Sequence, residues 1–293
     1  MEFTAKDVMA LRQRSGAGMM DCKKALVECN GDIDKAMDYL REKSLAASSK
    51  KAARIAAEGI VDCYTENGVG VIIEVNCETD FVAKTDDFHN LVISLAKHIA
   101  KMNPATVEEM MEQTFSEDKS MTVANVINAA VSKIGEKITI RRFNRVEGVI
   151  DTYVHLGGTV GAMISVSNND DMEAVHDVSM QVAAAKPVCM RIEDCDQADV
   201  EHEREILREQ AKNDPKPKPP AIIEKMVEGR IQKYYKEVCL LEQPFIKNPD
   251  ESVAQMINGK FEVLTFTRYE MGEGLQKRED NFAEEVMSQT KKA

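Results

Sequence analysis

The stretch EGIVDCY at residues 58–64 recurs as EGVIDTY at residues 147–153, so the chain contains an internal repeat. In each copy a turn follows, over residues 66–68 or 156–159, and then a β-branched apolar strand, over 69–75 or 160–166. A helix comes next and stops before a proline. Each copy therefore predicts a β-hairpin covered by a helix. Because a lone hairpin is marginally stable, we expect both units in one α+β core.

The two units differ directly after their second strand. The first unit carries TDFVAK at residues 79–84, whereas the second has SNNDD at 167–171, which is ordinary turn chemistry. The helix after the insert has its own cap at Thr85 and its own apolar face, so it does not need Phe81. An arbitrary phenylalanine is usually a core residue, and that remains the alternative. Since the second unit lacks the insert, we expect Asp80 and Phe81 to serve a purpose other than folding.

The composition indicates a globular protein that does not bind nucleic acid directly. Hydrophobic residues make up 43% and charged residues 30% of the 293-residue chain. The formal net charge of −12 is opposite to the balance that a phosphate backbone attracts. The sequence has no signal-like N-terminal segment and no run of membrane-spanning length, so we expect a soluble, cytoplasmic protein with no membrane partner.

The seven cysteines form an odd, unevenly spaced set without a C-x-x-C pair. This pattern favours reduced thiols over a disulfide framework or structural zinc. His155 precedes a Gly-Gly turn at a hairpin tip, where a solvated side chain is the usual outcome, and no second ligand stands at metal-binding spacing. We therefore expect no metal site.

Residues 1–45 predict three short helices. A linker follows over 46–57, and its helix-forming residues allow a helix at its end. The corner at residues 16–20, GAGMM, is not a dinucleotide loop, because no strand precedes it and Asp21 replaces the third glycine. A plain turn is the default interpretation. A contact surface is the alternative, since Met19 and Met20 cannot both point into so small a core.

Later segments predict further elements of the core and one projection. A helix begins near Thr122 and ends at Gly135, and the next strand carries Arg141, Arg142 and Arg145, which we expect to be mostly solvated. Residues 199–212 and 222–231 predict two helices of a hairpin whose tip, 213–220, contains four prolines that exclude helix. This hairpin could dock on a second copy of the chain or on another protein. A short helix over 252–258, a strand over 261–269 and a helix over 280–289 complete the chain.

No familiar catalytic motif occurs in the sequence. There is no G-x-x-x-x-G-K-[ST], H-E-x-x-H or G-x-S-x-G, and the five histidines stand singly. Covalent catalysis is disfavoured on this ground. Two rival classes remain: a small-molecule enzyme, which would turn over a substrate without a partner, and an adaptor that binds through residues 1–45 alone.

Two long motifs carry a family resemblance. GAGMMDCKKAL at 16–26 and EVNCETDFVAK at 74–84 closely resemble the signature stretches of bacterial translation elongation factor Ts. KIGE at 133–136, EKMVEGR at 224–230, QPF at 243–245 and GEG at 272–274 are also similar to that family. The resemblance implies a guanine nucleotide exchange factor for elongation factor Tu, which is not an enzyme and has no cofactor of its own.

The resemblance also implies a domain organisation. It comprises a ubiquitin-associated-like three-helix bundle, a two-part core, an inserted antiparallel helical hairpin and a C-terminal helical module. The expected ranges are 1–45 for the bundle, 46–57 for the linker, 58–146 for the core N-subdomain, 147–187 with 230–270 for the core C-subdomain, 188–229 for the hairpin and 271–293 for the C-terminal module.

The family's functional residues map onto matching positions of this chain. Asp80 and Phe81 would enter the partner's nucleotide site, and residues Thr79 to Val82 would help to displace its Mg²⁺. The resemblance also implies that Ile134 lies beside Phe81 and that His155 touches a different domain of the partner. The contacts that it implies with the partner's nucleotide-binding domain come from Arg12, Met19, Met20 and the C-terminal helix. The PKPKPP tip and the acidic arm over 201–209 depart from the expected pattern, which leaves formation of a homodimer open.

Overall fold

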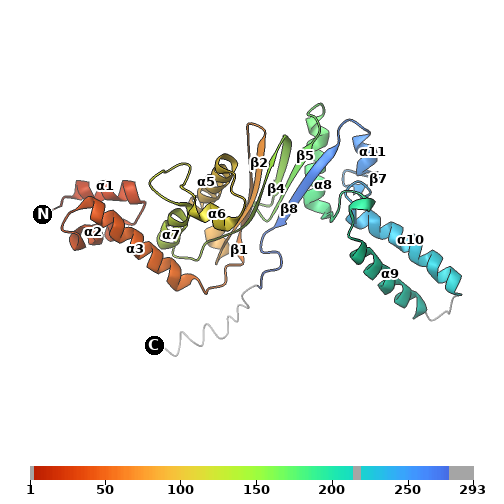
Figure 1. Cartoon of the computed structure of the whole chain (residues 1–293), viewed down its shortest axis with the longest axis horizontal. Coiled ribbons are helices and arrows are strands. Elements are labelled where there is room, and N and C mark those ends of the chain that lie inside the picture. The colour runs from red at the N-terminus through yellow and green to blue at the C-terminus, as the bar shows by residue number, and fades with distance from the viewer. Residues whose placement is uncertain (1–2, 214–218, 277–293) are drawn as a thin grey trace.

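The computed structural model describes residues 3–213 and 219–276 and shows a mixed α/β protein (Figure 1). Figure 1 places the N-terminal helices and a long helical hairpin at opposite ends of the molecule, with the sheets between them. Among the described residues, no helix has both the length and the apolar character that crossing a bilayer requires.

Three helices form the N-terminal bundle: α1 (Ala5–Ser15), α2 (Met19–Glu28) and α3 (Ile33–Lys51). Thr4 caps α1 in a capping box, and Gly16 ends it with φ 66°. Leu11 and Leu26 are fully buried in the small core. The helix α3 continues to Lys51, so the first half of the predicted linker is helical. Its small, helix-forming side chains explain the extension.

The first repeat unit builds an antiparallel sheet in the order β1-β2-β3. Its strands are β1 (Glu58–Glu66), β2 (Val69–Cys77) and β3 (Thr139–Glu147). Both residues of the Asn67-Gly68 turn have positive φ, which matches the predicted hairpin. The helices of this unit are α4 (Asp80–Ala83), α5 (Asp86–Met102), α6 (Val107–Glu112) and α7 (Val123–Ile134). The helix α5 buries Phe88, Leu95 and Ile99 in the first core cluster.

The second repeat unit builds a sheet in the order β4-β5-β8. Its strands are β4 (Val149–His155), β5 (Val160–Val166) and β8 (Val263–Glu270), and α8 (Met172–Ala185) packs on them with its own core cluster. Smaller elements complete this half: the 3₁₀ turn η1 (Ile192–Asp194), β6 (Pro244–Phe245), β7 (Asn248–Ser252) and α11 (Val253–Ile257). The predicted hairpin-plus-helix repeat is therefore confirmed.

The two sheets pack against each other through one apolar cluster that contains Val61, Ile72 and Met163. Gly70 of β2 and Gly161 of β5 occupy equivalent positions of the repeat. A Cβ on Gly70 would lie 2.5 Å from Ile150 Cγ2, and one on Gly161 would lie 2.5 Å from Val61 Cγ1. The paired glycines therefore allow the sheets to approach closely.

The helical hairpin consists of α9 (Gln197–Lys212) and α10 (Pro220–Val238). Ion pairs join the two helices, with Arg204 bound to Glu228 at 2.7 Å and Arg208 to Glu224 at 3.1 Å. The prediction that all four prolines lie outside a helix was wrong, because Pro220 begins α10, where its missing N–H has no intrahelical acceptor. The expected boundary at residue 229 falls inside α10. Residues 214–218 of the tip and the predicted C-terminal helix, 280–289, lie outside the described residues.

Two sequence-based expectations about side chains were wrong. Arg141, Arg142 and Arg145 are not mostly solvated, because Arg141 and Arg142 both bind the fully buried Glu74, and Arg145 donates to the carbonyl oxygen of Ala100. The cysteines are not all reduced, since Cys189 and Cys195 form a disulfide. Glu74 lies 67 and 68 residues before the two arginines, so only the fold brings these charges together. Cys189 and Cys195 are six residues apart, but their spacing is not a C-x-x-C pair.

Candidate functional site

The insert of the first unit forms a single helical turn, α4, between β2 and α5. Thr79 caps it, because its side-chain oxygen accepts a hydrogen bond from the Val82 backbone N–H at 3.3 Å. Ala83 is buried and Val82 packs partly on the first core cluster. The ring of Phe81 points away from that core, with 80% of the residue exposed. The interpretation of Phe81 as a core aromatic is therefore wrong, and the turn exposes the ring at the surface.

Glu136, directly after the end of α7, fixes this turn in place. Its carboxylate accepts hydrogen bonds from the backbone N–H groups of Glu78 and Thr79, each at 3.0 Å, and from the Thr79 hydroxyl at 2.6 Å. Bonds to an ionised acceptor are stronger than neutral ones. In return, the Glu78 side chain accepts from the Lys137 backbone N–H at 2.6 Å. The exposed ring therefore stands on an anchored segment, not on a free loop.

Asp80 lies beside the ring and carries a local counter-charge. Lys84, one helical turn later, donates to Asp80 Oδ2 at 2.6 Å. This hydrogen bond holds the pKa of Asp80 below its ordinary value. At neutral pH the side chain is therefore an anion on the surface, adjacent to an exposed aromatic.

A second exposed apolar surface lies on the N-terminal bundle. Met19 is 43% and Met20 73% exposed at the start of α2, and Arg12 is exposed on α1. The contact-surface interpretation of the GAGMM corner therefore fits the structure. Gly18 and Asp21 line one hollow together with Lys133 of α7. Glu136, which follows α7, binds Thr79, so α7 and the residues after it lie beside both exposed surfaces.

The remaining predicted residues take different positions. Ile134 ends α7, two residues before Glu136, and packs partly on the first core cluster. His155 is exposed at the end of β4, where its Nδ1 is 3.0 Å from the Tyr153 hydroxyl and the two rings stack at 5.9 Å. The structure therefore joins Thr79 to the residue that follows α7, whereas His155 contacts Tyr153 of its own strand.

Sequence reasoning missed the anchoring role of Glu136. The residue belongs to the KIGE motif, but a glutamate after a helix-ending glycine gives no local sign of its partners. Its hydrogen-bond donors lie 57 and 58 residues earlier in the chain.

Residues 78–273, about two-thirds of the chain, match the family model described as Elongation factor TS. The chain belongs to the elongation factor Ts family. Elongation factor Ts proteins are nucleotide exchange factors for elongation factor Tu in translation elongation, and this function is exchange rather than covalent catalysis. The matched region begins at Glu78, at the edge of the insert, and includes Glu136 and the helical hairpin. The family match therefore includes both the exposed turn and the residue that anchors it.

Proposed function

We propose that this chain accelerates GDP release from elongation factor Tu by inserting Phe81 and Asp80 at the partner's Mg²⁺ and phosphate site. The observation that carries the proposal is the exposed phenyl ring on a turn held by three hydrogen bonds to Glu136. An anchored ring loses little conformational freedom on binding, so most of its burial energy is available to displace partner side chains. Central aromatic residues of this kind dominate binding energy at many interfaces.

The charge of Asp80 supports a role next to a bound metal ion. A GTPase holds Mg²⁺ largely through phosphate oxygens, water and few protein ligands. Loss of one ligand, or displacement of a nearby segment, is therefore sufficient to loosen the nucleotide. In this proposal the segment Thr79 to Val82 perturbs the Mg²⁺ site, Phe81 acts as the wedge and Ile134 lies beside it.

We assign partner binding to the other exposed residues. Arg12, Met19 and Met20 on a ubiquitin-associated-like bundle hold the nucleotide-binding domain of the partner, and His155 contacts another of its domains. Methionine side chains adapt to varied apolar surfaces, which suits this task. The expected C-terminal module would add contacts from outside the described residues, and the helical hairpin is the surface for a second copy of the chain. The proposal places this activity in the cytoplasm.

The coupling between nucleotide and exchange factor is reciprocal. If this chain weakens GDP binding by some factor, GDP weakens binding of this chain by the same factor. The chain therefore binds GDP-bound elongation factor Tu transiently and its nucleotide-free form tightly. A high nucleotide concentration should expel it.

Stopped-flow release of fluorescently labelled GDP from purified elongation factor Tu tests the proposal. Phe81→Ala should slow stimulated release about 30-fold, equivalent to about 2 kcal/mol, while affinity for the partner falls much less. Met20→Ala should mainly weaken affinity and leave the release rate at saturation nearly unchanged. Leu264→Ala is the matched control, because it truncates another exposed apolar residue, on β8.

Three outcomes would contradict the proposal. An unchanged rate of GDP release with Phe81→Ala would show that Phe81 does not act as a wedge. Turnover of a substrate without elongation factor Tu would favour an enzyme. Loss of exchange on deletion of residues 1–45, together with a harmless change at Asp80 and Phe81, would favour an adaptor.

A further inference from the structure

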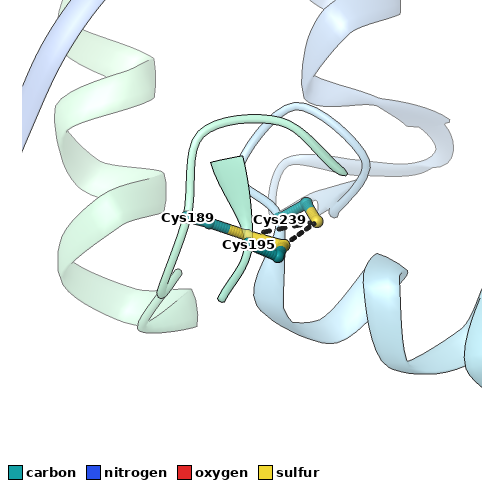
Figure 2. A group of neighbouring side chains, drawn as sticks. All are labelled: Cys189, Cys195 and Cys239. Atoms are coloured by element: carbon teal, nitrogen blue, oxygen red, sulfur yellow. Dashed lines mark hydrogen bonds between the residues drawn. A yellow bond between two sulfur atoms is a disulfide. The ribbon is translucent and has the colours of Figure 1, made fainter. Parts of the chain in front are cut away.

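Three cysteines from separate segments converge at the base of the helical hairpin (Figure 2). Cys189 follows α8, Cys195 follows η1, and Cys239 ends α10. Cys239 Sγ lies 3.3 Å from Cys189 Sγ and 3.2 Å from Cys195 Sγ. All three residues are buried, and Cys239 is completely so. The disulfide between Cys189 and Cys195 therefore has a third sulfur in contact with both of its atoms.

The three cysteines occupy the position at which the hairpin leaves and re-enters the core. The backbone N–H of Val188 donates to the Val238 carbonyl at 2.8 Å, and that of Leu240 donates to Cys189 at 2.9 Å. A parallel bridge pairs Cys189 with Cys239. A bond or ligand shared by the three sulfurs would therefore connect both ends of α9–α10 to the second repeat unit.

We propose that, in the reduced chain, Cys189, Cys195 and Cys239 together bind one Zn²⁺ ion at the root of the hairpin. Thiolates are preferred zinc ligands, and three protein ligands leave the fourth tetrahedral position for water or another small ligand. The disulfide is the oxidised form of the same group, in which two of the three ligands are bonded to each other. This site is independent of the exchange surface around Phe81.

The geometry needs only a small adjustment to receive the ion. All three sulfurs lie within 4.8 Å of one another. Zinc–sulfur bonds of about 2.3 Å in a tetrahedral site place sulfurs about 3.8 Å apart. The sulfur of Cys239 must therefore move about half an ångström from each neighbour, and the other two sulfurs separate once their bond is reduced. Cys189 and Cys195 lie outside helices, which allows the change.

The charges around the cysteines favour a cation over a free thiolate. Burial, followed by the nearby carboxylates of Glu242, Asp194 and Glu193, raises the pKa of Cys239 to about 11. A divalent ion reverses the balance, because it stabilises the thiolates and is itself attracted by the three carboxylates.

The structural alternative is that Cys239 only fills space. Val200, Val227 and Ile231 belong to the same apolar cluster, and a buried free cysteine often acts as a small hydrophobic residue. This alternative explains the burial of one thiol. It does not explain why three sulfurs meet when the disulfide needs only two.

Metal titration of the whole chain decides between these interpretations. The protein is reduced with a phosphine under oxygen-free conditions and titrated with Cd²⁺, a spectroscopic substitute for Zn²⁺. The ultraviolet thiolate-to-cadmium band should saturate at one ion per chain, and added Zn²⁺ should displace it. Cys239→Ser should abolish the band. Cys29→Ser is the matched control, because it removes a free thiol of the N-terminal bundle, and it should leave the band unchanged.

Several results would overturn the proposal. These are a reduced chain without a saturating band, a band that survives Cys239→Ser, or reformation of the disulfide on exposure to air despite excess Zn²⁺. Circular dichroism reports whether Cys239→Ser folds. If it does not, Cys195→Ala serves in its place, since it also removes one ligand. Metal binding is measured on this chain alone, whereas GDP release is measured with elongation factor Tu. A negative metal titration therefore does not contradict the proposed exchange function, and unchanged GDP release does not contradict the metal site.

Discussion

The two repeat units share a scaffold but differ in what they present. In each, the second strand lies at the centre of its sheet, and a helix follows. After β5 the chain turns through Asn168 and Asp171, whose side chains accept local backbone hydrogen bonds and start α8. After β2 the chain instead forms α4 and exposes Phe81. Duplication thus provides a stable scaffold, and the insert adds a binding feature to only one copy.

The units also differ at one equivalent buried position. Glu74 of β2 and Ser165 of β5 both stand sixth in their strands. Glu74 accepts from Arg142 at 2.7 Å, from Arg141 at 2.9 Å and from the Gly272 backbone N–H at 2.8 Å. Ser165 makes one hydroxyl contact, with Thr265 at 2.7 Å. The first unit is therefore held by buried charge and the second by a neutral bond.

The largest effect on stability is expected for substitution of Glu74, at the position that Ser165 occupies in the second unit. Glu74→Ala should lower the free energy of unfolding by about 3–5 kcal/mol, because it leaves two partly buried arginines without their shared carboxylate. Ser165→Ala should cost only about 1 kcal/mol. Urea unfolding measures both. Equal losses would mean that the two positions do not differ as described.

Alanine substitution of the equivalent glycines in the two repeats should lower stability by different amounts. Gly59 and Gly148 both have positive φ, near 141° and 135°. A Cβ on Gly59 would overlap the Val75 carbonyl oxygen, whereas one on Gly148 would meet nothing within 4 Å. Both alanine variants carry backbone strain, so we expect Gly59→Ala to be less stable than Gly148→Ala by about 2 kcal/mol. Thermal unfolding of the pair tests this, and a smaller loss at Gly59 would refute the close approach.

Loss of the anchor of the insert should reduce exchange without removing the ring. Glu136→Ala frees Glu78 and Thr79 from the end of α7, so the proposed wedge must be ordered during binding. We expect GDP release to slow about 10-fold, equivalent to about 1.4 kcal/mol. Glu147→Ala removes an exposed carboxylate at the end of β3 and serves as the control. Full activity of Glu136→Ala would show that α4 needs no anchor.

The smallest expected effect is a pH dependence confined to the first unit. His98 of α5 is buried, and burial holds its pKa below the ordinary value of 6.5. Below about pH 6.5 the unfolded chain binds a proton that the folded chain does not. Stability should therefore fall as the pH drops from 6.5 through the lowered folded pKa.

His98→Gln should flatten this dependence, as measured by urea unfolding between pH 5 and 7. The exposed His202 provides the control, since His202→Gln should leave the slope unchanged. If the stability of His98→Gln keeps the same pH dependence, titratable groups other than His98 cause it.

Local patterns predicted much of this fold. The E-G-x-x-D-x-Y repeat, the Asn67-Gly68 turn and the helix caps at Thr85 and Gly135 all appear where the sequence indicates them. Each signal depends on residues a few positions apart. By contrast, the continuation of α3 into the expected linker was missed, because small helix-forming residues suit either state.

The candidate site was predicted unevenly for the same reason. Comparison of the two repeats singled out Asp80 and Phe81, because an insert in one copy is visible in the sequence. Glu136, which holds that insert, was visible only in the structure. The cysteines gave a wrong expectation, since Cys189 and Cys195 form a bond and their third neighbour stands 44 residues beyond Cys195.

The sequence by itself determined the duplicated hairpin-and-helix units, the N-terminal helices, the helical hairpin, and the segment that one unit has and the other lacks. Tertiary structure alone decided that the Phe81 ring faces solvent, that Glu74 and Glu136 each bind several partners, and that three sulfurs meet. The physical reason is distance along the chain. Periodicity and capping act between neighbours, whereas buried charges and thiols are satisfied by groups tens of residues away, which only the packing of the finished fold brings within reach.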